Sequence, residues 1–204
     1  MKNAKKLILL ALCAVLLVGA SVMGTLAYLT SQTETITNTM TVGKVEISLT
    51  ENQMETDGLT QSSTVVDVTN NPLTNAYKLI PGHTYDKNPT VTVKEGSEPC
   101  YVFVKVENGI VTLEDSGNTI AAQIAANGWA ELAGVDNVFY KKIETVTATD
   151  TQHPVFTTFK IAGNANELSA WNNSVTIQIT AYAIQADGFD TAAAAWAASG
   201  FGTP

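Results

Sequence analysis

The chain has little positive charge, few histidines and almost no cysteine. Its 204 residues include no Arg, and 11 Lys stand against 19 Asp and Glu. Nucleic-acid binding depends on clustered Lys and Arg that contact phosphates, so this composition excludes nucleic acid as a partner. The two histidines, His83 and His153, lie far apart in the sequence and lack the spacing of a zinc motif. We predict no metal site and no cofactor.

Nucleophile motifs are also missing, since neither a GxSxG elbow nor a Walker loop occurs. Cys100 is one candidate nucleophile, but its place at the start of an apolar strand favours a buried, inert thiol. The pairs Glu114-Asp115 and Asp187 with Asp190 offer oxygen ligands for calcium without the spacing of a calcium loop. Turn and helix-cap roles explain both pairs more simply.

The first 30 residues, by contrast, carry a strong signal. Lys2, Lys5 and Lys6 precede an uncharged apolar run from Leu7 to Ala20, the pattern of an export signal. Small residues before Tyr28 predict cleavage after Ala27, so that only residues 1–27 contact the membrane, and only before cleavage. The alternative is an uncleaved anchor, because the apolar stretch is long enough to span a bilayer.

Cleavage leaves an acidic chain with a single cysteine. Removal of residues 1–27 takes three of the 11 Lys and none of the acidic residues, so the formal charge becomes about −11. Cys100 alone cannot form an internal disulfide. A Lys-to-Asn isopeptide bond stabilises some surface sandwiches, but it requires a buried acid beside the pair, which no sequence pattern identifies.

Alternation with period two dominates residues 43–204. Val45, Ile47 and Leu49 alternate with polar residues, and the run from Val102 to Val106 alternates in the same way, which predicts half-buried strands. Further strands are predicted at 90–94, 138–146, 155–161 and 175–184. Many short strands between turn residues predict a single all-β domain, a jelly-roll-like antiparallel β-sandwich.

Turns and short helices complete this expectation. Asn108-Gly109 predicts a hairpin over residues 101–114. One or two short helices are expected in the connections, one of them at 119–127, capped by Asn118 or Thr119 and ended by Gly128. A short C-terminal helix is expected from Asp190, as its N-cap, through Ala198. It should end at Gly200 and bury Ala193, Trp196 and Ala197.

Strand patterns with turn residues recur in six segments, whose order and spacing extend over nearly the whole chain. They are residues 24–30 (GTLAYLT), 41–49 (TVGKVEISL), 78–82 (KLIPG), 89–93 (PTVTV), 101–106 (YVFVKV) and 179–189 (ITAYAIQADGF). Together these segments resemble the TasA and camelysin family of exported proteins of Gram-positive bacteria.

This resemblance implies a secreted structural protein, located in the extracellular matrix or at the cell surface. Family members carry signal peptides processed by a SipW-type signal peptidase, and the best-known member polymerises into biofilm-matrix fibres by donating an N-terminal strand to its neighbour. The corresponding donor here is the segment 28–42. Ile36, Met40 and Val42 fall at even spacing in it and form an apolar edge. The alternative for this segment is a flexible stalk or a strand of its own domain.

Two other functions remain open at this stage. Camelysin is described as a metal-dependent protease, but the chain offers no motif that supplies zinc ligands, so no catalytic residue and no enzyme activity are predicted. A cell-surface adhesin or glycan-binding sandwich would use Trp129, Trp171 or Tyr182 as a stacking surface. Core packing is the simpler role for these aromatic residues.

Overall fold

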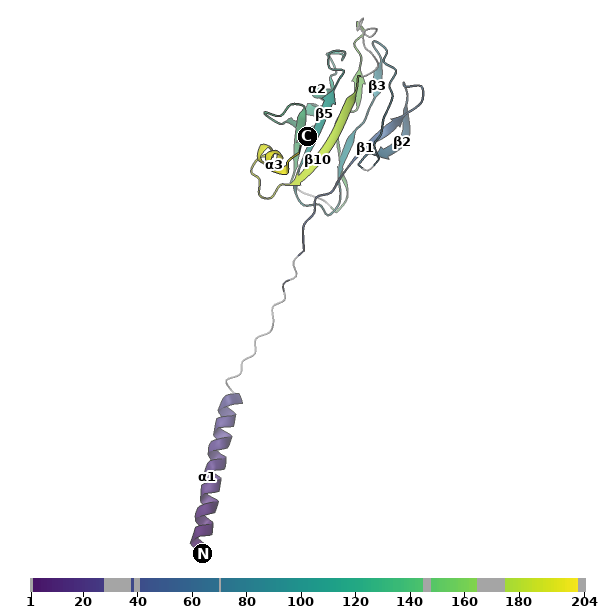
Figure 1. Ribbon diagram of the computed structural model, residues 1–204. Coiled ribbons are helices and arrows are strands. Elements are labelled where there is room, and N and C mark those ends of the chain that lie inside the picture. Colours follow the sequence, from purple (N-terminus) through teal and green to yellow (C-terminus); the bar gives the residue numbers. More distant parts are fainter. Residues whose placement is uncertain are drawn as a thin grey trace. The chain divides into compact units, whose positions relative to one another are not determined.

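The structure is a computed structural model that describes residues 2–27, 38, 41–69, 71–144, 148–164 and 175–201. The chain divides into two units, Met1–Thr41 and Val42–Pro204 (Figure 1). The first contains α1 (Lys2–Ala27), and its stretch Asn3–Ala20 is apolar and long enough to cross a membrane, as signal sequences also are. The described side chains of α1 are exposed, with Leu10 at 74%. This helix therefore has no protein core of its own.

The second unit is mostly antiparallel β-structure with two short helices, as predicted. One sheet has the strand order β2-β1-β4-β8, a second has the order β10-β5-β7-β6, and β3 pairs with β9. The strands are β1 (Ile47–Met54), β2 (Gln61–Asp67), β3 (Thr84–Asp86), β4 (Thr90–Val93), β5 (Cys100–Asn108), β6 (Ala130–Glu131), β7 (Val138–Ile143), β8 (Thr151–Pro154), β9 (Thr158–Lys160) and β10 (Ile177–Gln185). The helices are α2 (Ile120–Ala126) and α3 (Ala192–Ser199).

Two hydrophobic cores hold this unit together. The main core lies between the sheets. Its most buried part contains Val91, Val102 and Phe156, which are fully buried. The second core lies between the β5 sheet and α3, with Phe103 and Trp196 5.1 Å apart between ring centres. Its buried members are Tyr101, Phe103, Leu132, Val138, Ala192, Ala195 and Trp196.

The second core corrects the prediction that residues 102–106 form a half-buried strand. In β5 both faces are buried, since Val102 and Val104 face the main core while Phe103 faces the second core. Alternation still marks the two faces of the strand. One of them, which we expected to be solvent-exposed, is covered by α3.

The hairpin predicted over residues 101–114 is wrong. β5 pairs with β10 and β7, which are distant in sequence. Gly109 does not adopt the positive φ of a type I′ turn. Its N–H instead donates to the Thr176 carbonyl at 2.9 Å, and a Cβ at this position would lie 2.7 Å from that same oxygen. Glycine is needed here for close backbone approach.

The structure confirms the short helices with small changes at their ends. Thr119 caps α2, as its side chain accepts a hydrogen bond from the Ala122 N–H. The N-cap of α3 is Thr191 and not Asp190. The helix therefore begins one residue later than expected, and Ala192, Ala195 and Trp196 form its buried face. Ala193 and Ala197, predicted to be buried, are exposed.

The strand predicted at 155–161 is interrupted. β8 ends at Pro154 and β9 begins at Thr158. Between them Val155 and Phe156 are fully buried in the main core, although they belong to no strand. Burial alone produced the apolar pattern that we interpreted as a strand.

Candidate functional site

The last strand of the domain, β10, ends its sheet and pairs only with β5 among the described strands. The Gly109 N–H donates to the Thr176 carbonyl, and the Ala186 N–H donates to the Pro99 carbonyl. In this antiparallel register, the even-numbered residues of β10 therefore bond to β5. The N–H and C=O groups of the odd-numbered residues point away from β5, toward the open edge.

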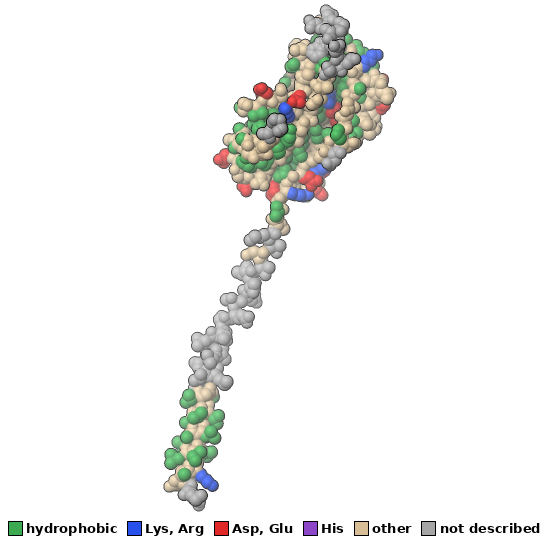
Figure 2. Space-filling view, viewed as in Figure 1, with side chains coloured by type: hydrophobic (Ala, Val, Ile, Leu, Met, Phe, Trp, Pro, Cys, Tyr) green, Lys and Arg blue, Asp and Glu red, His purple; other side chains and the backbone are tan. Residues whose placement is uncertain are grey.

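The side chains of the odd-numbered residues also form the inner face of β10, the face that points toward the main core. Ile177, Ile179, Ala181 and Ala183 pack against the main core but are only partly buried, as is Ile47 on β1. The side chains of the core are thus fully buried at its centre and only partly buried along β10. Figure 2 shows hydrophobic side chains on the face of the domain that carries β10. Backbone groups that no described strand pairs and a half-covered apolar rim thus lie on the same edge, which β1 approaches.

The other edge strands of the two four-stranded sheets, β2, β8 and β6, carry features that block pairing with another chain. β2 has a register shift and ends in Asp67, β8 contains Pro154, and β6 has only two residues. Irregularity, charge, proline and shortness are the usual protections of an edge strand. β10 is nine residues long, has a continuous register with β5 and contains neither charge nor proline. It is therefore the edge most suited to accept an added strand.

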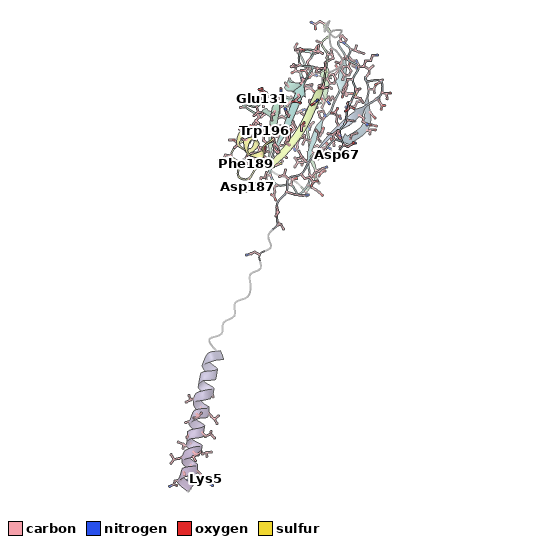
Figure 3. The ribbon with its side chains drawn as sticks, in the orientation of Figure 1. Lys5, Asp67, Glu131, Asp187, Phe189 and Trp196 are labelled. Carbon is pink, nitrogen blue, oxygen red and sulfur yellow. The ribbon has the colours of Figure 1, made fainter. Side chains whose placement is uncertain are left out.

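The opposite face of β10 is closed by α3. The Tyr182 ring stacks on Phe201 at 4.8 Å and meets Trp196 edge-on at 5.6 Å. Trp196 and Phe189 lie at the α3 end of the domain (Figure 3). A partner strand can therefore approach β10 along its edge and inner rim, whereas its outer face is occupied.

The N-terminal residues that we predicted to be functional lie largely outside the described part of the chain. α1 ends at Ala27, the residue after which cleavage is predicted. Tyr28, Ile36 and Met40 lie outside the described residues. Val42 is described, and its side chain is 99% exposed. It is an apolar side chain without a buried environment in the single chain.

The structure separates the residues that were considered for catalysis. Cys100 is fully buried, and desolvation raises the pKa of its thiol to about 11, so that the thiol stays protonated at neutral pH. His83 packs edge-on against the Tyr85 ring at 4.5 Å. His153 lies in β8, and its Nε2 is buried without a hydrogen-bond partner. Among the described residues, no group of three His, Cys, Asp or Glu side chains is arranged to hold a metal ion.

Of the two acidic pairs considered as calcium ligands, Glu114 and Asp115 have structural contacts. Glu114 Oε1 accepts a hydrogen bond from the Ile120 N–H at 3.0 Å, at the start of α2. Asp115 accepts from the Gly117 N–H at 3.0 Å and pairs with Lys160 at 3.3 Å. These are helix-start and turn contacts, and they occupy oxygens that a cation would need.

The aromatic residues considered for glycan stacking are not open platforms. Trp129 is 3% exposed, and its Nε1–H donates to the Pro154 carbonyl at 2.8 Å. Tyr182 contacts the aromatic rings of the second core, and Trp171 lies outside the described residues. The two described aromatic side chains are thus used in packing.

Sequence reasoning missed the open edge of β10, although part of its signal was present. The segment 175–184 was predicted as a strand, and its lack of charge and proline is visible in the sequence. Its place at the end of a sheet was not visible, because that depends on which strands pair. Comparison of the chain with protein-family models, with curated proteins and with solved structures found no match.

Proposed function

We propose that this chain is an exported structural subunit of extracellular biofilm-matrix fibres, located in the matrix or at the cell surface. In this proposal the domain is a jelly-roll-like sandwich, and α1 is a signal peptide removed after Ala27 by a SipW-type peptidase. The N-terminal segment 28–42 of one copy then adds to the free edge of β10 in the next. The subunit has no catalytic role.

The observation that carries this proposal is the unprotected edge of β10 above a half-covered core. An added strand would pair with the outward N–H and C=O groups of the odd-numbered residues. Its alternate side chains would cover the rim formed by Ile177, Ile179 and Ala181. The exposed side chain of Val42 fits a segment that is buried only on a neighbouring copy.

The polarity of such a contact favours filaments. The donor precedes the domain and the acceptor is the last strand, so each copy offers two different surfaces. A head-to-tail contact of this kind extends without limit unless its rotation closes a ring. Before cleavage, the donor remains attached to the apolar helix α1, and release from that helix makes assembly possible.

The test compares two purified proteins, residues 28–204 and residues 43–204, by electron microscopy and sedimentation. We expect filaments from the first and monomers from the second, with the same β-rich circular dichroism spectrum from the domain. A second variant keeps the full segment 28–42: replacement of Ile36 and Met40 by Asp should abolish filaments while the domain stays folded. A protein of residues 28–204 that remains monomeric at high concentration would refute the proposed role.

A further inference from the structure

Three polar side chains meet in the wall of the main core. Glu51 lies on the same face of β1 as the core residue Leu49, and Lys87 follows β3. Glu51 and Lys87 are 9% and 5% exposed. Asn75 comes from the strandless stretch between β2 and β3 and is half-buried. Lys and Glu side chains are rarely buried to this degree unless they are paired.

One carboxylate holds both an amine and an amide. Lys87 Nζ donates to Glu51 Oε1 at 2.8 Å and to Oε2 at 2.7 Å. Asn75 Nδ2 donates to the same Oε1 at 2.9 Å. The amine nitrogen and the amide group are therefore brought together at a single oxygen atom, which can exchange protons with either of them.

The Asn75 amide is also held in one orientation. Its Oδ1 accepts a hydrogen bond from the Met54 N–H at 2.9 Å, and its Nδ2 donates a second bond to the Asn52 carbonyl at 3.0 Å. A backbone N–H at the amide oxygen is placed to stabilise negative charge that develops there during attack on the carbonyl carbon.

Aromatic rings lie on one side of the cluster. Tyr77 packs beside it, with its ring edge-on to those of Tyr85 and Phe159 at 5.8 and 5.0 Å. Burial, together with the charge of Glu51, raises the pKa of the Tyr77 hydroxyl. The Glu51 carboxylate accepts hydrogen bonds from the Lys87 amine and the Asn75 amide at once, so it is the group of the cluster placed to carry a proton between them.

From this geometry we propose that Lys87 and Asn75 join in an intramolecular isopeptide bond, with Glu51 as the proton carrier. Glu51 takes a proton from Lys87 Nζ, and the nitrogen lone pair then attacks Cγ of Asn75. The Met54 N–H stabilises the negative charge on Oδ1. When this intermediate collapses, the Cγ–Nδ2 bond breaks and its electron pair stays on Nδ2.

The reaction is balanced without a further reagent. Glu51 relays the protons lost by Lys87 Nζ to Asn75 Nδ2, which leaves as ammonium, and the carboxylate is regenerated. A primary amine and a primary amide become a secondary amide, with no oxidation or reduction. A hollow of about 510 Å³ lined by residues 54–58 and 74–78 borders Asn75, which gives the ammonium a route to solvent.

The bond would brace a stretch of the domain that has no regular secondary structure. Residues 71–83 cross the domain without forming a strand. The later half of this stretch is tied to neighbouring segments, since the Lys78 N–H donates to the Gly58 carbonyl and the Gly82 N–H to the Ile161 carbonyl, both at 2.9 Å. A link from Asn75 to Lys87 fastens this stretch to the connection between β3 and β4. Both cysteines, Cys13 and Cys100, are free, so no disulfide serves this purpose.

The test is a tryptic peptide map of the folded wild-type protein, read by mass spectrometry. Trypsin cannot cleave after a Lys whose side chain is amide-linked. We therefore expect residues 45–78 to be joined to residues 79–94, with no cleavage after Lys87. The joined species should weigh about 17 Da less than its two parts, the mass of the ammonia lost.

Variants assign the roles within the cluster. Lys87→Arg keeps the positive charge beside Glu51 and should give no link, as should Glu51→Gln, and circular dichroism confirms that both are folded. Lys94→Arg is the matched control, because Lys94 forms an exposed ion pair with Asp150, and it should keep the link. Normal cleavage after Lys87 in the folded wild type, with Asn75 either intact or converted to a succinimide, would overturn the proposal.

Discussion

Proline scanning at two neighbouring positions of β10 tests the direction of its backbone groups. The Thr180 N–H belongs to the set that bonds to β5, whereas the Ala181 N–H points to the open edge. Proline removes the N–H group and tolerates an extended backbone. Thr180→Pro should therefore damage the fold, and Ala181→Pro should damage only the association of copies.

The expected magnitudes differ widely. Thr180→Pro removes one ladder bond and leaves the Lys105 carbonyl without its partner, which costs about 2–4 kcal/mol of unfolding free energy. Ala181→Pro removes no bond within the domain and exchanges one small side chain for another, so its effect should stay within about 1 kcal/mol. For an incoming strand, Ala181→Pro removes one hydrogen-bond donor of β10 and places a ring against the incoming backbone, a loss of about 1.4–3 kcal/mol of association free energy.

Two assays separate these effects. Urea unfolding of residues 43–204 measures the fold alone, and the critical concentration for sedimentation of residues 28–204 measures assembly. Ala181→Pro should raise that concentration about 10- to 100-fold, since each 1.4 kcal/mol corresponds to a factor of ten. Equal destabilisation of the monomer by both variants would refute the assigned bond directions. Unchanged assembly of Ala181→Pro would show that β10 is not the acceptor edge.

Two further predictions concern the domain itself. Gly109→Ala would place a Cβ 2.7 Å from the Thr176 oxygen and should cost about 1–3 kcal/mol, whereas Gly163→Ala, with no atom within 4 Å, should change urea unfolding by less than about 0.5 kcal/mol. Burial, with a smaller contribution from Lys141, lowers the pKa of His153, so the unfolded chain binds its proton more readily and stability should fall as pH drops from 7 to 5. The slope can reach about 1.4 kcal/mol per pH unit, and it should be reduced in His153→Gln; an unchanged slope would exclude His153 as its source.

The sequence was sufficient where local chemistry decides the structure. Alternation located β1, β4 and β5, and the Thr119 and Gly128 signals bounded α2. It was insufficient where a distant element changes a local rule. The local sequence Asn108-Gly109 predicts a hairpin, but in the structure Thr176 approaches Gly109 instead. Alternation predicts that Phe103 faces solvent, but α3 covers it.

The β10 edge and the Lys87–Glu51–Asn75 cluster also differ in how much of each site the sequence predicts. The apolar, uncharged composition of β10 is visible in the sequence, but its position at a sheet edge is a property of strand order. The Lys87–Glu51–Asn75 cluster has no local signature, since its members come from three separate segments of the chain and meet at one Glu51 oxygen only after folding. An isolated Lys or Asn in a polar stretch resembles any other.

The pairing of β10 with β5 also sets an order of events in time. Cys100 pairs with Gln185, so the sheet cannot close until nearly the whole chain is available. Pairings this distant in sequence form late and slowly. A chain that emerges from its N-terminus presents residues 28–42 before the described strands and completes β10 last among them. The two partners in the proposed assembly are thus kept apart during synthesis by the direction in which the chain is made, and a newly made subunit exposes its donor before it has an acceptor edge to receive one.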